Sequence, residues 1–304
     1  MNWQQKLLNP ALKLIEKRHM ANAKGPEILR KAFELKAKMF FYAPRGTEME
    51  WFDVGGTSAL RIGGDAFDPE RVILYIHGGG HVFGSPKTHS AMLAQLAKRV
   101  GCEVILPVYP LSPENVYPTS LNTVRAVYDG LLDQGMPAAK IVIGGDSAGG
   151  NLALALLAQL LADGADLPAG VFAFSPLTDM TYSGASFQVN AKADVILPAE
   201  RAAEMAQMYL DGHDAMDPFV SPFVADFAGA PPVWLAVGDT EILLDDTRRL
   251  FAEMKKQCVD VQMHIERNLP YDWPIFHHIL PEARATLDGL AGWINRRAGW
   301  ADES

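Results

Sequence analysis

The stretch Gly145-Asp146-Ser147-Ala148-Gly149-Gly150 decides how the rest of this sequence is interpreted. It directly follows the apolar run 141–144 and directly precedes a helix-compatible run at 151–161. A strand, a Gly-x-Ser-x-Gly turn and a helix, in that order, hold a serine on a strained turn that lifts its hydroxyl clear of the sheet. The glycines two residues to either side of Ser147 leave room for the chain to pass closely. The stretch therefore predicts a nucleophilic serine at the end of a buried strand.

A second glycine-rich motif, His77-Gly78-Gly79-Gly80, follows another predicted strand at 72–76. Glycine lets the backbone approach a reacting carbon closely, and backbone N–H groups can then stabilise the negative oxygen that forms there. Together the two motifs indicate a hydrolase that attacks a carbonyl group with serine.

Composition and charge restrict the class of protein. The chain has 304 residues, 49% of them apolar, and a net charge of −9. Its length suits one large α/β domain, and its acidity argues against nucleic acid and anionic membranes as partners. Cys102 and Cys258 form no Cys-x-x-Cys pair, which argues against a metal or redox site. The sequence has no run of about 18 apolar residues that would span a membrane and no signal-peptide pattern, so we expect a cytoplasmic protein.

Strand and helix patterns alternate from residue 49 onward. Period-two alternation around Gly55-Gly56 predicts a hairpin of 49–54 and 58–62. Nearly continuous apolar runs, typical of parallel strands covered on both faces, follow at 72–76, 104–108, 141–144, 170–175, 233–237 and 259–266. Helical patterns separate them at 89–99, 120–134, 150–163, 245–257 and 282–297. This order predicts a doubly wound α/β sheet.

Two segments fall outside this alternation. Residues 1–45 contain two amphipathic helices, with apolar faces that include Leu7, Ile15 and Phe40. Residues 180–222 contain polar turns and a helix near 199–210. We expect the second segment to fold back onto the first.

The motifs, in this order and spacing, resemble those of the hormone-sensitive-lipase family of α/β-hydrolases, in its microbial esterase branch. Besides the two glycine motifs, the resemblance rests on the segments 109–114, 175–179 and 221–232, and it extends over about residues 70–297. It implies a single domain, 1–304, with the α/β-hydrolase fold, an eight-stranded, mostly parallel sheet, and a helical cap formed by about 1–45 and 180–222. It also implies small short-chain esters or lactones as substrates, neither cofactor nor metal, and an oxyanion hole of Gly79, Gly80 and Ala148.

The resemblance also places an acid after the strand at 233–237. The family's pattern there is Asp-Pro-Leu-x-Asp, and Leu243 and Asp245 match its third and fifth positions. This register places Glu241 at the catalytic acid, and glutamate can hold an imidazole as aspartate does. Asp239, two residues earlier, is the competing candidate.

The histidine that acts as the base in this family is replaced by a tyrosine in this sequence. The family's segment Met-Pro-His-x-Trp corresponds to Leu269-Pro270-Tyr271-Asp272-Trp273, so Tyr271 stands where the histidine belongs. A phenol titrates near 10 and an imidazole near 6.5, so a neutral tyrosine is a poor acceptor of the serine proton. We therefore expect an impaired carboxylesterase with Ser147, Glu241 and Tyr271 at its triad positions. We also expect the phenol to donate a hydrogen bond to Glu241.

A replacement base and another class of function stay open at this point. The candidate bases are His81, His264, His277 and His278, and His81 is the best placed because it follows the glycine motif. The alternative function is a small-molecule binding protein that keeps the pocket without hydrolysis. The sequence also leaves open whether the chain forms a homodimer and whether Tyr271 is natural or introduced.

Overall fold

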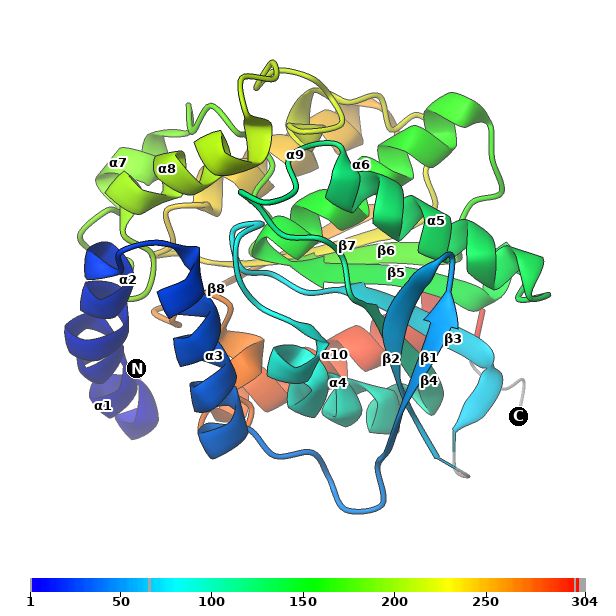
Figure 1. Cartoon of the computed structure of the whole chain (residues 1–304), viewed down its shortest axis with the longest axis horizontal. Coiled ribbons are helices and arrows are strands. Elements are labelled where there is room, and N and C mark those ends of the chain that lie inside the picture. Colours follow the sequence, from blue (N-terminus) through cyan, green and yellow to red (C-terminus); the bar gives the residue numbers. More distant parts are fainter. Residues whose placement is uncertain (1, 65–66, 298, 301–304) are drawn as a thin grey trace.

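The core of the molecule is an eight-stranded sheet in a computed structural model that describes residues 2–64, 67–297 and 299–300 (Figure 1). The strands lie in the order β1-β2-β4-β3-β5-β6-β7-β8. β2 is antiparallel to β1 and β4, and the other neighbours are parallel, which confirms the mostly parallel sheet. The strands are β1 (Glu48–Val54), β2 (Thr57–Gly63), β3 (Asp68–Ile76), β4 (Cys102–Pro107), β5 (Ile141–Asp146), β6 (Gly170–Phe174), β7 (Val233–Gly238) and β8 (Val261–Glu266).

Helices cover both faces of this sheet (Figure 1). One layer contains α4 (Pro86–Val100) and α10 (Pro281–Arg297), and the other contains α5 (Thr119–Asp133), α6 (Ser147–Asp163) and α9 (Leu244–Lys256). In β3, Ile73 and Tyr75 pack with the first layer, whereas Val72, Leu74 and Ile76 pack with the second. Because successive side chains of a strand point to opposite faces, an unbroken apolar run supplies both layers. Short 3-10 turns occur at η2 (Ala138–Lys140), η3 (Pro222–Val224) and η4 (Trp273–Phe276).

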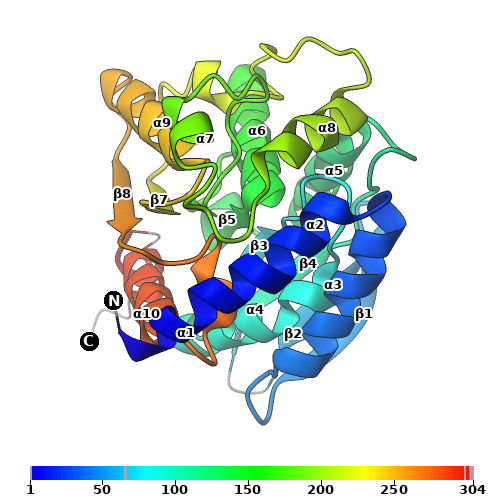
Figure 2. The ribbon, with the colours of Figure 1, turned by 90° about the vertical axis from the view of Figure 1, so that its left-hand side faces the viewer.

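The helices that precede the first strand lie beside those inserted between β6 and β7 (Figures 1 and 2). Arg201 donates to the carbonyl of Ala23 at 3.1 Å, and Lys17 donates to the carbonyl of Ala191 at 2.6 Å. The two segments that interrupt the alternating pattern therefore pack against each other. The first contains α1 (Trp3–Leu12), the π-helical turn η1 (Lys13–Lys17), α2 (Arg18–Asn22) and α3 (Pro26–Phe40), and the second contains α7 (Ala185–Val189) and α8 (Ala199–Leu210).

Two sequence-based predictions need correction. The helix predicted at 150–163 begins three residues earlier, so Ser147 is the first residue of α6. The apolar faces predicted for the first two helices are only partly buried, because Leu7 and Ile15 each expose 66% of their surface and Phe40 exposes 61%. An amphipathic pattern identifies the residues that share a face, but it does not show whether another element covers that face. Of the helices in the described ranges, none is long and apolar enough to cross a membrane.

Candidate active site

Ser147 lies on a strained turn between β5 and α6. Its φ of 54° is in the left-handed region that residues other than glycine rarely adopt. The chain can make this turn because glycines occupy the points of closest approach. A Cβ on Gly145 would lie 2.4 Å from the carbonyl oxygen of Gly149, and one on Gly149 would lie 2.0 Å from that of Ile76. The N-terminus of α6 is therefore held against the end of β3, where the second glycine motif begins.

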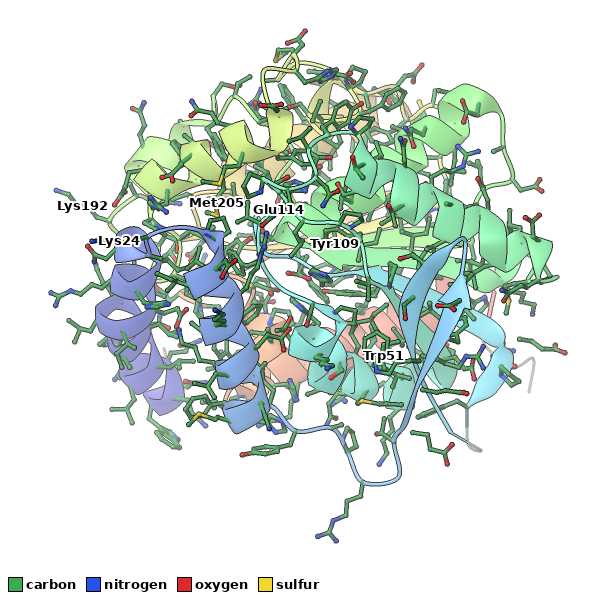
Figure 3. The ribbon with its side chains drawn as sticks, viewed as in Figure 1. Lys24, Trp51, Tyr109, Glu114, Lys192 and Met205 are labelled. Atoms are coloured by element: carbon green, nitrogen blue, oxygen red, sulfur yellow. The ribbon has the colours of Figure 1, made fainter. Side chains whose placement is uncertain are left out.

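The glycine-rich loop after β3 brings unpaired backbone donors to this place. Gly79 and Gly80 have φ values of 122° and 59°, and within the described chain their N–H groups donate to no other group. The N–H of Ala148 is free as well, because it belongs to the first turn of α6. Met205 of α8 covers the loop, since a Cβ on Gly80 would lie 2.8 Å from its sulfur (Figure 3). These N–H groups form a set of donors that can bind a developing oxyanion next to Ser147.

Glu241 is fully buried, and only one of its two oxygens is paired. Its Oε1 accepts hydrogen bonds from the backbone N–H of Gly238 at 2.7 Å and from the hydroxyl of Ser175 at 2.9 Å. Its Oε2 has no partner among the residues that the structure describes. Burial, reinforced by the charge of Asp194, raises the pKa of Glu241 well above its ordinary value. A buried carboxyl oxygen without a partner is rare, and it marks a position at which a donor is missing.

Asp239, the competing candidate, is engaged elsewhere. Its Oδ1 accepts a hydrogen bond from the backbone N–H of Asn268 at 2.7 Å. The charge of Glu241 contributes to the pKa of Tyr271, whereas the charge of Asp239 is not among the causes of that shift. Glu241 is thus among the carboxyl groups that act on Tyr271, together with Asp272 and Asp146.

Tyr271 is buried, with its hydroxyl close to that of Ser147. Burial raises the pKa of Tyr271 well above its ordinary value, although the neighbouring Ser147 hydroxyl acts in the opposite direction. Within the described chain the Tyr271 hydroxyl makes no hydrogen bond of good geometry. The expected bond from the phenol to Glu241 is therefore wrong. A phenol has a single oxygen at the far end of its ring, and here that oxygen lies near Ser147.

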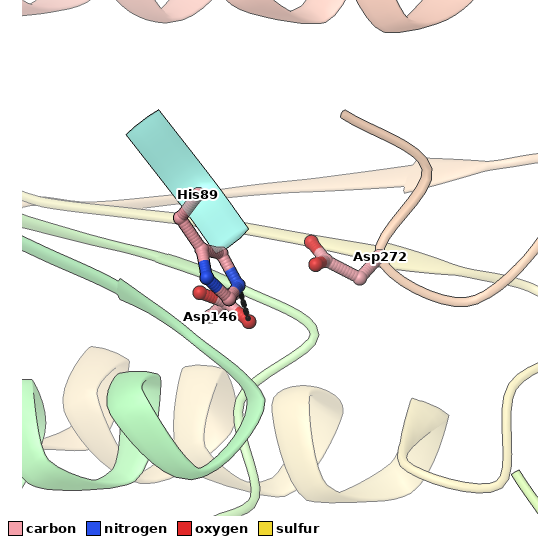
Figure 4. Close-up of side chains that lie close together, drawn as sticks. All are labelled: His89, Asp146 and Asp272. Atoms are coloured by element: carbon pink, nitrogen blue, oxygen red, sulfur yellow. Dashed lines mark ion pairs between the residues drawn. The ribbon is translucent and has the colours of Figure 1, made fainter. Parts of the chain in front are cut away.

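A pair of buried carboxyl groups lies directly beside these residues (Figure 4). One oxygen of Asp146 accepts a hydrogen bond from the Tyr75 hydroxyl at 2.8 Å, and the other lies 3.4 Å from Nε2 of His89. Burial and the charge of Asp146 raise the pKa of Asp272 well above its ordinary value, because two carboxyl groups this close disfavour each other's ionised form. His89, Asp146 and Asp272 place one ligand atom each within 4.8 Å of one another, and they are the set in the described ranges that could hold a metal ion.

Asp272 has no role in the sequence-based prediction. The consecutive residues Asp146 and Ser147 face the consecutive residues Asp272 and Tyr271. Asp272 adopts a φ of 47° at this point of the chain, a conformation that aspartate tolerates better than most residues. Its position next to Tyr271 in the sequence could have suggested a place in the site. That residues 271–272 lie against residues 146–147 is known only from the folded chain.

The replacement bases considered from the sequence are poorly suited to the task. Burial lowers the pKa of His81 to about 3, and its ring stacks on a tyrosine of α8 with centroids 3.7 Å apart. Burial lowers the pKa of His277 to about 4, and its ring packs against His278. His264 stacks on a tryptophan of the neighbouring strand β7. Imidazoles with such low pKa values are weak proton acceptors, which argues against His81 and His277 as the base. The ring of His278 is hydrogen-bonded to the backbone of Tyr42.

Ser147 and Tyr271 line a cavity of about 820 Å³. Its walls are mostly apolar side chains of α1, α3 and α8, including Leu12, Phe33 and Met205. Its volume lies within the range of pockets that hold small organic molecules, and the polar groups gathered around Ser147 can orient such a molecule.

Comparison with known proteins identifies relatives that cover most of the chain. Residues 73–275 match the family described as alpha/beta hydrolase fold. The chain is 34% identical over 268 residues to an esterase of Acinetobacter venetianus, with 88% of each chain covered. It is 33% identical over 229 residues to an acetyl-hydrolase of Streptomyces hygroscopicus, with 75% of this chain and 77% of the relative covered.

Solved structures of esterases and lipases also match nearly the whole chain. An esterase from the bacterial hormone-sensitive lipase family matches with a TM-score of 0.92 and 32% identity, over 98% of this chain and 99% of that one. A hormone-sensitive lipase from a metagenome library matches with a TM-score of 0.91 and 31% identity, over 96% and 98% of the two chains. Coverage this complete takes in the sheet, its helices and most of the two segments beside the cavity.

Proposed function

Because this chain belongs to the hormone-sensitive-lipase family of α/β-hydrolases, we propose that it carries the machinery of a serine carboxylesterase for small short-chain esters or lactones. Segments 1–45 and 180–222 form a cap over its pocket, within a single domain. The proposed site consists of the nucleophile Ser147, the acid Glu241, position 271 of the base, and the oxyanion donors Gly79, Gly80 and Ala148.

In the proposed reaction the Ser147 hydroxyl attacks the ester carbonyl, and a tetrahedral intermediate forms. The negative oxygen of that intermediate accepts hydrogen bonds from the unpaired N–H groups of the glycine loop and of Ala148. These donors are fixed before the reaction, so they stabilise the charge without rearrangement. The ester C–O bond then breaks, the proton from Ser147 goes to the departing alkoxide, and an acyl-serine remains. Water attacks the acyl carbonyl through a second tetrahedral intermediate, which releases the carboxylic acid and restores the Ser147 hydroxyl.

We further propose that Tyr271 occupies the position of the base and leaves this sequence impaired. An imidazole has two nitrogen atoms, so it can donate to a carboxylate and accept from a serine at the same time. A phenol has one oxygen and cannot bridge both partners. The unpaired Oε2 of Glu241 is the observation that carries this proposal, because a buried carboxyl oxygen is expected to have a donor.

The variant Tyr271→His tests the proposal. We expect kcat for p-nitrophenyl acetate to rise by at least about a thousandfold, because only the proton shuttle is missing. KM should change little, since the base acts in the transition state rather than in ground-state binding. Tyr271→Phe is the matched control and should stay slow, and adding Ser147→Ala to the histidine variant should abolish the gain.

The second candidate function is a small-molecule binding protein, which a capped apolar cavity without a base would also suit. A histidine variant that folds normally and stays slow would contradict the esterase proposal and support binding alone. If the unmodified chain is already fast, the base lies elsewhere, and His81→Ala would then be the next variant to measure.

A further inference from the structure

The first 45 residues differ in charge from the rest of the chain. Ten of the 27 basic residues but only three of the 36 acidic residues fall in this segment. It therefore carries a charge of +7, whereas residues 46–304 carry −16. The net charge of −9 conceals this separation. The acidity of the whole chain therefore does not argue against an anionic partner for the first 45 residues.

The same segment carries a disproportionate share of the exposed apolar side chains. Nine of the sixteen large hydrophobic residues that are exposed in the described chain lie within it. Trp3 and Leu7, for example, expose 68% and 66% of their surface. Apolar side chains that gather in one region of a surface mark a site of contact with another molecule or with lipid.

In the first helix these side chains form a stripe. Trp3, Leu7 and Leu14 stand at positions i, i+4 and i+11, which places them on one face of the helix that α1 and η1 form. Lys6 and Lys13 are seven residues apart, so they lie about two turns apart along the same edge of this stripe, and both are exposed.

The helix α3 repeats the arrangement. Ile28, Leu35 and Met39 stand at i, i+7 and i+11, and the exposed residues Lys31 and Lys38 are again seven residues apart along the edge. We call this surface the basic–apolar face, which comprises Trp3, Lys6, Leu7, Lys13, Leu14, Ile28, Lys31, Leu35, Lys38 and Met39.

The two helices that carry the stripes lie on one side of the molecule. Figure 2 shows α1 and α3 side by side in front of the sheet, and Lys36 of α3 pairs with Glu16 of η1 at 2.6 Å. Figure 3 shows Lys24 and Lys192 extending outward at the same end of the molecule. The positive charge at this end is therefore broader than the face itself.

The lysines of the basic–apolar face are largely available to a partner. Lys6 and Lys38 have no acidic partner among the described residues, and Lys13 binds only the carbonyl of Lys192, at 2.7 Å. Lys31 lies 3.5 Å from a glutamate one turn away, but both side chains are more than 70% exposed, and such pairs contribute little.

The mouth of the cavity adjoins this face. Ile15, Met39 and Phe40 line the cavity, yet they expose 66%, 52% and 61% of their surface, so they belong to its rim. An apolar rim continues directly into the apolar stripes of the two helices.

We propose that the basic–apolar face binds the surface of an anionic lipid bilayer, with the mouth of the cavity turned toward the lipid. Lysines attract anionic head groups, while tryptophan and aliphatic side chains enter the boundary between head groups and acyl chains. A second copy that covered the stripes with its own basic–apolar face would bring +7 against +7, so charge disfavours a symmetric dimer through this face. Lysines beside apolar stripes match the boundary of an anionic bilayer.

Sedimentation with lipid vesicles tests this inference independently of any hydrolysis. The full chain is mixed with vesicles of phosphatidylcholine alone or of phosphatidylcholine and phosphatidylglycerol in equal parts. We expect binding to the second kind only, with an increase in salt concentration weakening it. Equal binding to both kinds, or binding to neither, would overturn the proposal.

Charge reversal on the face supplies the decisive variant. The four changes Lys6→Glu, Lys13→Glu, Lys31→Glu and Lys38→Glu should weaken binding to the anionic vesicles by at least about a hundredfold, at roughly fivefold for each lysine near the lipid. The matched control reverses four exposed basic residues elsewhere, at Lys98, Lys255, Lys256 and Arg267, and should retain most of the binding.

A separate double variant removes apolar surface without altering charge. Leu7→Gln and Leu35→Gln together should weaken vesicle binding while thermal unfolding stays unchanged, because both side chains are exposed. If the control reversals weaken binding as much as those on the face, attraction is nonspecific and the proposal fails. It also fails if size-exclusion chromatography with light scattering shows a dimer that the face reversals dissociate, because the face would then be an interface between copies.

Discussion

At the scale of single residues, the chemistry of the site depends on what position 271 can hold. A tyrosine there leaves Oε2 of Glu241 without a partner and leaves the buried carboxyl group with a raised pKa. An imidazole at position 271 would supply a donor to Oε2, and its protonated form would lower the pKa of Glu241 again.

The variant Glu241→Gln should therefore have different effects in two backgrounds. In the present sequence it should change the residual rate little, because no imidazolium forms there for the carboxyl group to stabilise. Combined with Tyr271→His, it should lower kcat by at least about a hundredfold, because it cannot stabilise the imidazolium that forms. Rates of the single and double variants on p-nitrophenyl acetate measure this coupling. Equal losses in both backgrounds would contradict the assignment of Glu241.

The sequence identifies part of this site and not the rest, for a physical reason. Ser147 and the glycine motifs can be found because a strained turn and close backbone contacts need particular residues at fixed spacing. Asp272 cannot be found in this way. Its partner, Asp146, is far away in the sequence, and nothing local in either segment encodes their contact.

At the scale of secondary-structure elements, the turn between β5 and α6 is the feature that positions the site. Both flanking glycines face backbone atoms, and backbone cannot move aside as a flexible side chain can. The strands predicted from the sequence are all present. Continuous apolar runs identify buried strands such as β5 and β7, whereas β8, predicted as covered on both faces, is only partly buried. The exposure of α1 and α3 was not predictable, since it depends on which element covers a helix rather than on the helix itself.

The variant Gly149→Ala should disrupt this turn. Its Cβ would lie 2.0 Å from the carbonyl oxygen of Ile76, so α6 would have to move away from β3. We expect a loss of stability beyond the usual 1–3 kcal/mol of an overpacked core, or an insoluble protein. The matched control is Gly289→Ala in α10, where a Cβ would meet nothing within 4 Å. That change should stabilise the protein by about 0.5–1 kcal/mol in urea unfolding. Equal stabilities of the two variants would show that the close approach at Gly149 is absent.

At the scale of the whole molecule, buried carboxyl groups make stability depend on pH. Asp246 at the start of α9 accepts hydrogen bonds from the backbone N–H groups of Thr178 and Asp179 at 2.8 and 3.0 Å. Burial raises its pKa from 3.8 to about 7, and the charge of Asp179 adds to the shift, while the N–H donors and Arg249 oppose it. Between about pH 4 and pH 7 the folded chain therefore keeps a proton on Asp246 that the unfolded chain has already released.

The contribution of Asp246 to stability should be present at low pH and lost as the pH rises from about 4 to about 7. Asp246→Asn removes the titrating group and keeps one oxygen acceptor. The free energy of unfolding of the present sequence, relative to that of the variant, should fall across this interval and level off above it. Urea unfolding at a series of pH values measures the difference, and a difference that stays constant would contradict the raised pKa.

The uneven distribution of charge would orient the molecule as it approaches a negative surface. The first 45 residues carry +7 and the remainder −16, and helices of the positive segment line the entrance to the cavity. A negative surface would begin to rotate such a body within the Debye length, about 10 Å at roughly 0.1 M ionic strength, before any side chain touches it. Its acidic end would be turned away during the approach. More of the collisions would then be productive, and concentrated salt would remove this kinetic advantage while leaving the fold intact.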